Sequence, residues 1–126
     1  MIRNAINWFE IPATDIARAI TFYRTVLGQD IRAGEFMGVP HGFFSADQQG
    51  VAGAIIAPPD AAPSLDGPLI YLNAGQSLSA IVARVEPAGG RLLVAETPIG
   101  EQGAIAIFAD SEGNRIGLHA PPQDAG

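Results

Sequence analysis

Two side chains of types that commonly exchange protons in catalysis lie on strand-like segments at opposite ends of the sequence, Glu10 and His119. Glu10 follows Trp8 by two positions on a strand-like segment, so both side chains point to the same face. Contact with the indole would partly desolvate the carboxyl group and favour its protonated form. Because histidines titrate near neutrality, the pair could act as base and acid. It could equally give two ligands to a weakly held divalent metal, completed by His41 or by substrate oxygens.

Purely structural roles for the same residues are the more common outcome. A single Glu and a single His in a cavity usually bond to each other, to the backbone or to water. The segment Gly38-Val39-Pro40-His41-Gly42 is typical of a turn that leads into a strand, which predicts an exposed His41. Trp8 and Tyr71 could stack on a planar ligand or simply fill space, and the sequence leaves both open.

Composition limits the kinds of site that the chain can carry. The 126 residues are 48% hydrophobic, which indicates one folded domain, residues 1–126. The absence of cysteine excludes disulfides, thiolate nucleophiles and sulfur-ligated metals. Net charge is −6 and the seven cations, all arginines, are scattered, so we expect neither nucleic-acid nor membrane binding. No signal-like or membrane-spanning segment is evident, which predicts a cytoplasmic protein that binds small molecules or proteins.

One block of the sequence occurs twice. Ala46-Asp47-x-x-Gly50 followed by Ala57-Pro58-Pro59 recurs 63 positions later as Ala109-Asp110-x-x-Gly113 followed by Ala120-Pro121-Pro122. Half-domains of this size bury too little apolar surface to be stable alone, so two copies should share a core and enclose a cleft. The repeats span about 4–58 and 68–122, with a Pro-rich linker over 58–67.

Each repeat predicts the same order of elements, β-α-β-β-β. The first helix begins after Thr14-Asp15, carries apolar residues at helical spacing and ends at Gly28. The second runs from Ser77 to about Glu86 and aligns with the first at an offset of 62. The expected strands lie at about 4–12, 30–35, 41–46, 51–57, 68–74, 91–95, 104–108 and 114–120.

This order predicts an α+β fold in which each helix covers one face of a mixed sheet and the uncovered faces curl around a common cavity. Strand alternation assigns eight residues to the cavity: Trp8, Glu10, Ala54, Ile56, Tyr71, Asn73, Gly117 and His119. The residues expected to meet the helices are Phe9, Ile11, Val51, Ile55, Ile70, Leu72, Ile116 and Leu118.

Other conspicuous residues receive structural assignments. Gly113 should occupy a turn position with positive φ. The stretch 98–103 is a loop that could cover the cavity, although most such loops only connect strands. Arg18, Arg24 and Arg84 lie on helix faces, where we expect them to be solvated.

The helix sequence Asp15-Ile16-Ala17-Arg18-Ala19-Ile20-Thr21-Phe22-Tyr23-Arg24-Thr25-Val26-Leu27-Gly28, together with Phe108-Ala109-Asp110-Ser111-Glu112-Gly113-Asn114, resembles the vicinal oxygen chelate superfamily of glyoxalases, bleomycin-resistance proteins and extradiol dioxygenases. The resemblance covers essentially the whole chain. It implies tandem βαβββ repeats around a pseudo-twofold cavity, and a homodimer.

Members of that superfamily that are enzymes hold a divalent metal with His, Gln or Glu side chains from the cavity strands. At the matching positions this chain has Trp8, Tyr71, Gly117 and Ala54, which do not ligate such a cation in the usual way. The resemblance therefore implies no metal at the usual positions, and a cofactor that is either absent or a weakly held divalent metal. Glu10, Asn73 and His119 lie two residues further along the same strands and are the remaining polar candidates.

We therefore interpret the chain as a small-molecule-binding protein of the glyoxalase/bleomycin-resistance type. The alternative is an enzyme, a lyase or isomerase or a dioxygenase-type protein, that uses Glu10 and His119 with a relocated metal or as an acid-base pair. A third hypothesis is an interaction module without a small ligand. The sequence identifies neither the ligand nor whether the cavity is formed within one chain or between two.

Overall fold

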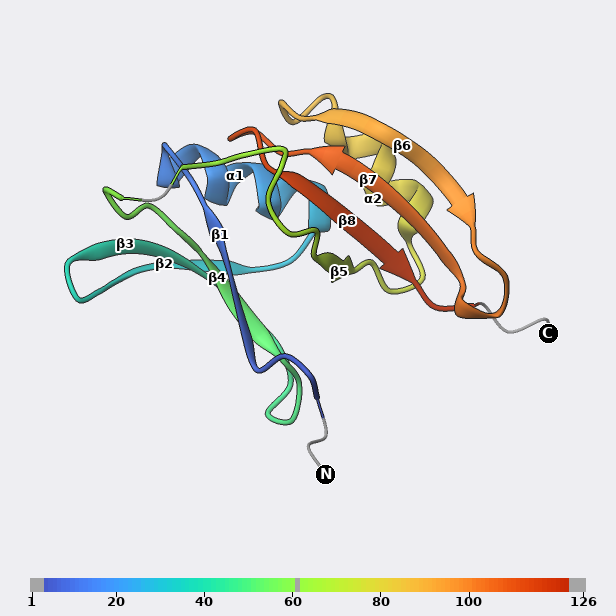
Figure 1. The fold of residues 1–126 in the computed structure, drawn as a ribbon, viewed down its shortest axis with the longest axis horizontal. Coiled ribbons are helices and arrows are strands. Elements are labelled where there is room, and N and C mark those ends of the chain that lie inside the picture. The colour runs from blue at the N-terminus through green and yellow to red at the C-terminus, as the bar shows by residue number, and fades with distance from the viewer. Residues whose placement is uncertain (1–3, 61, 123–126) are drawn as a thin grey trace.

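A computed structural model of the chain describes residues 4–60 and 62–122 and has two similar units, each with one helix and four strands. The first unit comprises β1 (Trp8–Pro12), α1 (Ile16–Leu27), β2 (Ile31–Phe36), β3 (Val39–Phe44) and β4 (Ala52–Ile56). Figure 1 shows this unit beside the second one, with the connecting segment crossing between them. The α+β architecture predicted from the repeat is confirmed.

The second unit repeats the order with different strand lengths. It comprises β5 (Tyr71–Asn73), α2 (Leu78–Val85), β6 (Arg91–Pro98), η1 (Gly100–Gln102), β7 (Ala104–Ala109) and β8 (Arg115–Ala120). The β5 strand is shorter than the sequence predicted, whereas β6 extends three residues further and contains two irregularities in its pairing with β7. The predicted loop after β6 contains a single turn of 3-10 helix.

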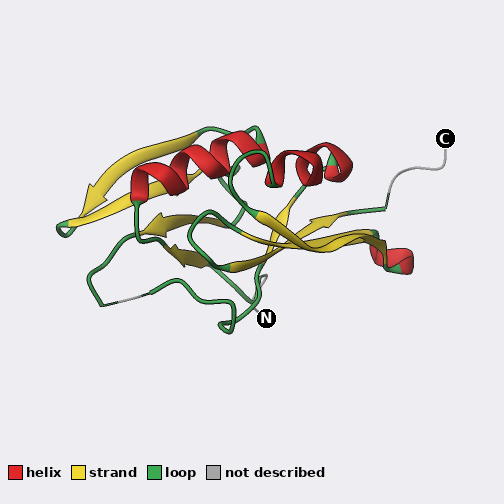
Figure 2. Ribbon diagram, turned by 90° about the horizontal axis from the view of Figure 1, so that it is seen from above, coloured by secondary structure: helices red, strands yellow, loops and turns green. Residues whose placement is uncertain are grey.

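The two sheets have the same topology. Their strand orders are β1-β4-β3-β2 and β5-β8-β7-β6, and in each sheet the first pair is parallel and the others are antiparallel. Both helices lie in one layer against the sheets (Figure 2). The opposite face of each sheet therefore has no helix over it. In the part of the chain that the structure describes, no helix is long and apolar enough to cross a membrane.

Local sequence explains why α1 begins and ends where it does. The Asp15 carboxylate accepts a bond from the Arg18 amide at 3.1 Å, and Gly28 adopts φ 66°, which suits the left-handed end of a helix. The start of α2 is different, because Ser77 makes no side-chain capping bond. The two helices are thus related by the repeat but are not stabilised in the same way.

The hydrophobic core lies between the helices and the sheets. The strand residues predicted to face the helices include five that are fully buried: Ile11, Ile55, Leu72, Ile116 and Leu118. Phe9 and Ile70 pack against the same core while remaining partly exposed. The prediction of which strand face meets the helices is therefore confirmed, and it leaves the other face of each sheet as the candidate site.

A turn of the second repeat fastens the two repeats together. The Glu112 side chain is only 1% exposed, and its Oε1 accepts hydrogen bonds from the Thr14 and Asp15 amides at 2.9 and 2.8 Å. Its Oε2 accepts a 2.7 Å bond from Arg18 Nε. A carboxylate from one repeat thus caps the first helix of the other, where the helix dipole favours negative charge.

The same turn is held from within by Asp110 and Asn114. Asp110 Oδ2 accepts bonds from the Tyr23 hydroxyl at 2.6 Å and from Asn114 Nδ2 at 2.9 Å, and Asn114 Nδ2 also reaches the Pro12 carbonyl at 2.7 Å. Burial, with the nearby Asp110 charge and bond, raises the pKa of Tyr23 well above its usual value. Gly113 has φ 97°, which confirms its predicted role in the turn.

Of the three helix arginines expected to be solvated, Arg18 and Arg24 are exposed and Arg84 is half-buried, but each also makes a bond that the sequence did not predict. Arg18 pairs with Glu112, Arg24 Nε bonds the Ile31 carbonyl at 2.9 Å, and Arg84 Nε bonds the Val26 carbonyl at 3.0 Å. Helical spacing correctly placed these side chains on the helix surfaces. It could not show that chain segments distant in sequence provide acceptors beside them.

We expect Glu112 to make folding depend on pH. Burial alone would raise its pKa, but bonds from Arg18, Asp15, Ser111 and Thr14 outweigh burial and lower the pKa from 4.5 to about 2. Because the folded-state value is the lower one, the stabilisation is present above about pH 4.5 and is lost as pH falls toward 2. The lost free energy of unfolding is about 2–3 kcal/mol. Urea unfolding between pH 7 and 3 should show that Glu112→Gln is less stable at pH 7 and loses less on acidification.

The exposed Glu101 supplies the matched control, since Glu101→Gln removes a carboxylate that bonds neither helix. An equal loss of stability between pH 7 and 3 in the parent and in Glu112→Gln would contradict this account of the junction.

Candidate functional site

On the uncovered face of the first sheet, Trp8 and Glu10 lie next to each other. Trp8 is 46% exposed, and its Nε1 donates a 3.3 Å hydrogen bond to Glu10 Oε2. Glu10 itself is exposed. The expected desolvation of Glu10 by the indole was therefore wrong, because the ring binds the carboxylate at its polar edge and leaves it in contact with solvent.

On the second sheet, three predicted site residues share one pocket. Its volume is about 720 Å³, and its walls are Tyr71, Asn73, Ile99, Gln102, Ile105, His119 and Pro121. Tyr71 is 46% exposed and occupies the repeat position of Trp8. The 98–103 loop contributes Ile99 and Gln102 to this pocket, which agrees with its predicted position beside the site.

The polar groups of this pocket are engaged with neighbouring backbone. His119 Nε2 lies 2.6 Å from the Gln102 carbonyl oxygen, so Nε2 is the protonated nitrogen and Nδ1 is the one that can accept. Asn73 Oδ1 accepts a 2.8 Å bond from the Gly75 amide, which leaves its NH₂ group for a ligand. His119 thus connects the 98–103 loop to β8, which is a structural role. Only its Nδ1 remains free to bind a ligand.

Three other predicted cavity residues lie in the strands of the two sheets and line none of the pockets described. Ala54 is fully buried, and Gly117 is buried beneath the Tyr71 ring, where an added Cβ would lie 2.4 Å from a ring carbon. Ile56 is half-buried. Because Ala54 is buried and the Tyr71 ring covers Gly117, a ligand on these faces would meet exposed side chains such as Tyr71 rather than these two residues.

His41 was predicted to be an exposed turn residue, and that prediction was wrong. The turn lies at Met37 and Gly38, which both have positive φ, and His41 belongs to β3 with 8% exposure. Its Nδ1 lies 2.8 Å from the Val39 carbonyl oxygen, and its ring stacks on Phe43 at 5.1 Å. The Pro-His-Gly sequence was misleading because Pro40 continues an extended strand here.

The sequence interpretation also missed aromatic residues on this face. Phe43 pairs with Ala54 in the register of β3 and β4, so it shares the face of Glu10, and Arg32 lies 5.9 Å above its ring. Phe36 contacts His41 edge to face. Alternation along 41–46 could have revealed Phe43 once the strand boundary was known.

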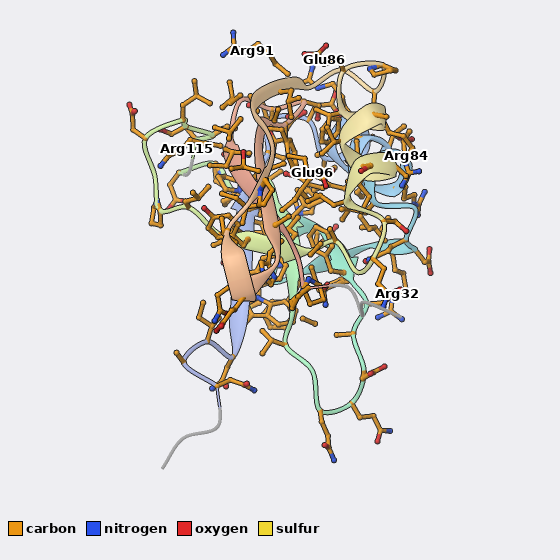
Figure 3. The ribbon with its side chains drawn as sticks, turned by 90° about the vertical axis from the view of Figure 1, so that its right-hand side faces the viewer. Arg32, Arg84, Glu86, Arg91, Glu96 and Arg115 are labelled. Carbon is orange, nitrogen blue, oxygen red and sulfur yellow. The ribbon has the colours of Figure 1, made fainter. Side chains whose placement is uncertain are left out.

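The structure thus gathers the predicted residues into two groups, one on each sheet. Trp8 and Glu10 lie outside the 720 Å³ pocket that contains Tyr71, Asn73 and His119. By strand register, Arg32 lies on the face of the first sheet that carries Glu10, and Arg115 lies on the face of the second sheet that carries Tyr71. In the view of Figure 3 the two arginines lie at opposite edges of the molecule. Within residues 4–60 and 62–122, no three His, Asp or Glu side chains gather as a metal site would require.

Comparison with known proteins points consistently to one family. The model of the Glyoxalase/Bleomycin resistance protein/Dioxygenase superfamily matches residues 5–118. The chain is 30% identical over 115 residues to the putative glyoxylase CFP32 of Mycobacterium tuberculosis, covering 89% of this chain and 44% of that protein. It therefore spans less than half the length of this curated relative.

Solved structures share the fold at lower identity. A glyoxalase/bleomycin resistance protein from Albidiferax ferrireducens has a TM-score of 0.73 at 21% identity, covering 94% of this chain and 100% of that one. TnmS3, an antibiotic binding protein from Streptomyces, scores 0.66 at 21% identity, with coverage of 96% and 98%. The fosfomycin resistance protein FosX from Listeria monocytogenes scores 0.64 at 15% identity, with coverage of 100% and 97%.

The two histidines should have opposite tautomers. The Val39 carbonyl accepts from His41 Nδ1, whereas the Gln102 carbonyl accepts from His119 Nε2. Long-range ¹⁵N–¹H NMR at alkaline pH, where imidazole is neutral, should show Nδ1–H for His41 and Nε2–H for His119. Spectra of His41→Ala and His119→Ala would assign the signals, and the same tautomer at both sites would contradict the described bonds.

Proposed function

The chain belongs to the glyoxalase/bleomycin resistance protein/dioxygenase superfamily, and on that premise we propose that it binds a small, partly apolar molecule on the uncovered faces of its two sheets. The observation that carries this proposal is the pair Trp8 and Tyr71. They occupy equivalent positions in the two repeats, and each is 46% exposed on a face that no helix covers. Exposed rings on both halves suit a planar ligand that stacks between them.

The donor set argues against the usual metal of the superfamily. Trp8, Ala54, Tyr71 and Gly117 stand where the resemblance places the ligands, and these side chains do not fit a hard or borderline cation. We therefore propose binding that is independent of metal. Recognition would come from stacking and from a few polar groups, among them the Glu10 carboxylate and the Asn73 amide.

Two structural neighbours support a small-molecule ligand. TnmS3 is described as an antibiotic binding protein and FosX as a fosfomycin resistance protein. For this chain the corresponding proposal is sequestration of a small, partly apolar compound. The 720 Å³ pocket beside Tyr71 is large enough for a drug-sized fragment.

We further propose that the protein acts as a homodimer, with a second copy enclosing the ligand. Apolar side chains on or beside the uncovered faces remain exposed in one chain, including Trp8, Tyr71 and Phe36. A twofold dimer that placed the face of one repeat opposite the other repeat of its partner would bring Trp8 and Tyr71 together twice. In this arrangement the ligand cavity forms between two chains rather than within one.

The enzyme alternative rests on Glu10 and His119. Its weakness is that one of the two His119 ring nitrogens is bound to Gln102, while Glu10 lies on the other sheet. If the protein has lyase, isomerase or dioxygenase activity, loss of that activity in both Glu10→Gln and His119→Ala would support this alternative. Full activity in either variant would remove that residue from the mechanism. An interaction module without a ligand would instead show a dry, filled cavity.

Ligand binding should depend on both aromatic residues. Because Trp8 is the sole tryptophan, its fluorescence can report titrations with bleomycin and with a panel of planar aromatic compounds. Tyr71→Ala should weaken any such complex by about tenfold through loss of stacking. Calorimetry with Trp8→Ala should show a similar loss, whereas Leu65→Ala, an exposed residue of the linker, serves as the control. Unchanged affinity in both aromatic variants would refute the proposed site.

Native mass spectrometry tests the metal and the dimer in one measurement. After exposure to Mn²⁺, Fe²⁺, Ni²⁺ and Zn²⁺, the untagged protein should have the mass of a dimer without stoichiometric metal, because the donor positions lack ligands. A co-purified organic mass would identify the ligand directly. Stoichiometric metal that disappears in Glu10→Gln or His119→Ala would favour the enzyme alternative instead.

A further inference from the structure

The internal repeat produces two junctions, in each of which a turn of one repeat lies beside the helix of the other repeat. The two junctions differ in their side chains. In the closed junction, the turn Asp110–Asn114 binds α1 at two places: Glu112 accepts from amides at its start, and Asp110 accepts from the Tyr23 hydroxyl further along the helix. The open junction is its repeat equivalent, where the turn Asp47–Gly50 faces the start of α2. Both turns are closed by the same internal bond, from the Gly50 amide to the Asp47 carbonyl at 2.9 Å and from the Gly113 amide to the Asp110 carbonyl at 3.2 Å, so the difference lies in the side chains.

The residues that fill the closed junction have shorter or differently charged counterparts in the open one. On the helices, at an offset of 62, Arg18, Phe22 and Tyr23 correspond to Ala80, Arg84 and Val85. In the turns, at an offset of 63, Glu112 and Asn114 correspond to Gln49 and Val51. Alanine and valine side chains cannot form the hydrogen bonds that tie the closed junction, and two aromatic rings are lost.

The consequence is a cleft of about 670 Å³ at the open junction. Its apolar walls come from both repeats, with Phe9, Leu27 and Phe44 from the first and Leu72 and Ile81 from the second. In the closed junction Phe22, the counterpart of Arg84, lies 5.8 Å from Phe108 and directly over Gly90, whereas Arg84 lies over the equivalent Gly28. The cleft is open to solvent, and its apolar walls suit an aromatic group.

The charged side chains in the lining of this cleft are Arg84 and Asp47. Arg84 projects from α2 (Figure 3), and its Nε is bonded to the Val26 carbonyl at 3.0 Å. That bond fixes the guanidinium while its terminal N–H groups remain able to bind a carboxylate. Asp47 is exposed on the opposite turn, so it can remain in solvent when an anion binds Arg84.

We propose that the open junction is a second small-molecule site, separate from the uncovered sheet faces, and that it takes a small aromatic carboxylate. The ring packs against the apolar walls of the cleft beside Arg84, and the carboxylate pairs with Arg84. This site does not depend on the proposed function, because Trp8 and Tyr71 are not part of its lining, although Asn73 borders both sites.

Phenylacetate is a suitable probe, and 2-phenylethanol is its matched neutral control. In amide-detected NMR of the full chain, phenylacetate should produce saturable shifts at Gly28, Gly75 and Ala80, which line the cleft. It should bind about tenfold more tightly than 2-phenylethanol, because the carboxylate gains a charged hydrogen bond. Arg84→Met should remove that difference while 2-phenylethanol binds as before.

Two further variants keep the test decisive if Arg84→Met is unstable. Ala80→Trp places a large ring from an exposed helix position into the cleft and should abolish binding of both probes. Tyr71→Ala alters the sheet face and should change neither affinity. The proposal is overturned if shifts at the cleft fail to saturate by concentrations on the order of 10 mM. It is equally overturned if Ala80→Trp binds phenylacetate normally, or if the shifts move to the Tyr71 pocket.

Discussion

The carboxylate of Glu112 at the start of α1 is the interaction on which the rest of the structure depends. Each repeat contributes one helix and four strands, too little apolar surface for a comfortable fold of its own. The turn that carries Glu112 joins the halves through bonds to Thr14, Asp15 and Arg18, while Tyr23 and Asp110 seal the interior beneath it. Because the carboxylate is buried and fully bonded, displacing one repeat from the other would leave a desolvated charge without partners, a costly state.

That arrangement places most of the core on one face of each sheet and leaves large side chains on the other face exposed. The fully buried apolar side chains of β1, β4, β5 and β8 that meet the helices form the core, so the alternate residues can vary without disturbing it. Trp8 and Tyr71 belong to this second set. Their exposure is easier to explain by contact with a ligand or a second copy than by the folding of one chain, since exposed aromatic rings contribute little to a monomer.

The sequence predicted what is determined locally and missed what depends on distant segments. The limits of α1 followed from Asp15 and Gly28 because capping is decided within one turn, and strand faces followed from alternation. The burial of His41 could not be predicted, since it depends on stacking against Phe43 and on where β3 begins. The Gln102 carbonyl beside His119 and the acceptors of the helix arginines were missed for the same reason: each joins segments separated along the chain. The repeat offset correctly paired residues but could not show that their environments differ.

In a duplicated fold, residues at equivalent positions of the two repeats can have different surroundings, and the two junctions are an example. One junction needs to be closed to hold the halves together, and the Glu112 network meets that need, so the second junction is released from it. Loss of an aromatic ring at a position such as Val85 would be expensive in a protein with one junction, because the cavity could not collapse. Here the cost is limited by the closed junction, and the opened volume acquires a cation at Arg84 in place of the Phe22 ring. The same reasoning applies to the sheet faces, where Trp8 and Tyr71 are exposed and lie outside the core. At the junctions and on the sheet faces alike, the residues that stabilise the fold are different from those that are free to bind a small molecule.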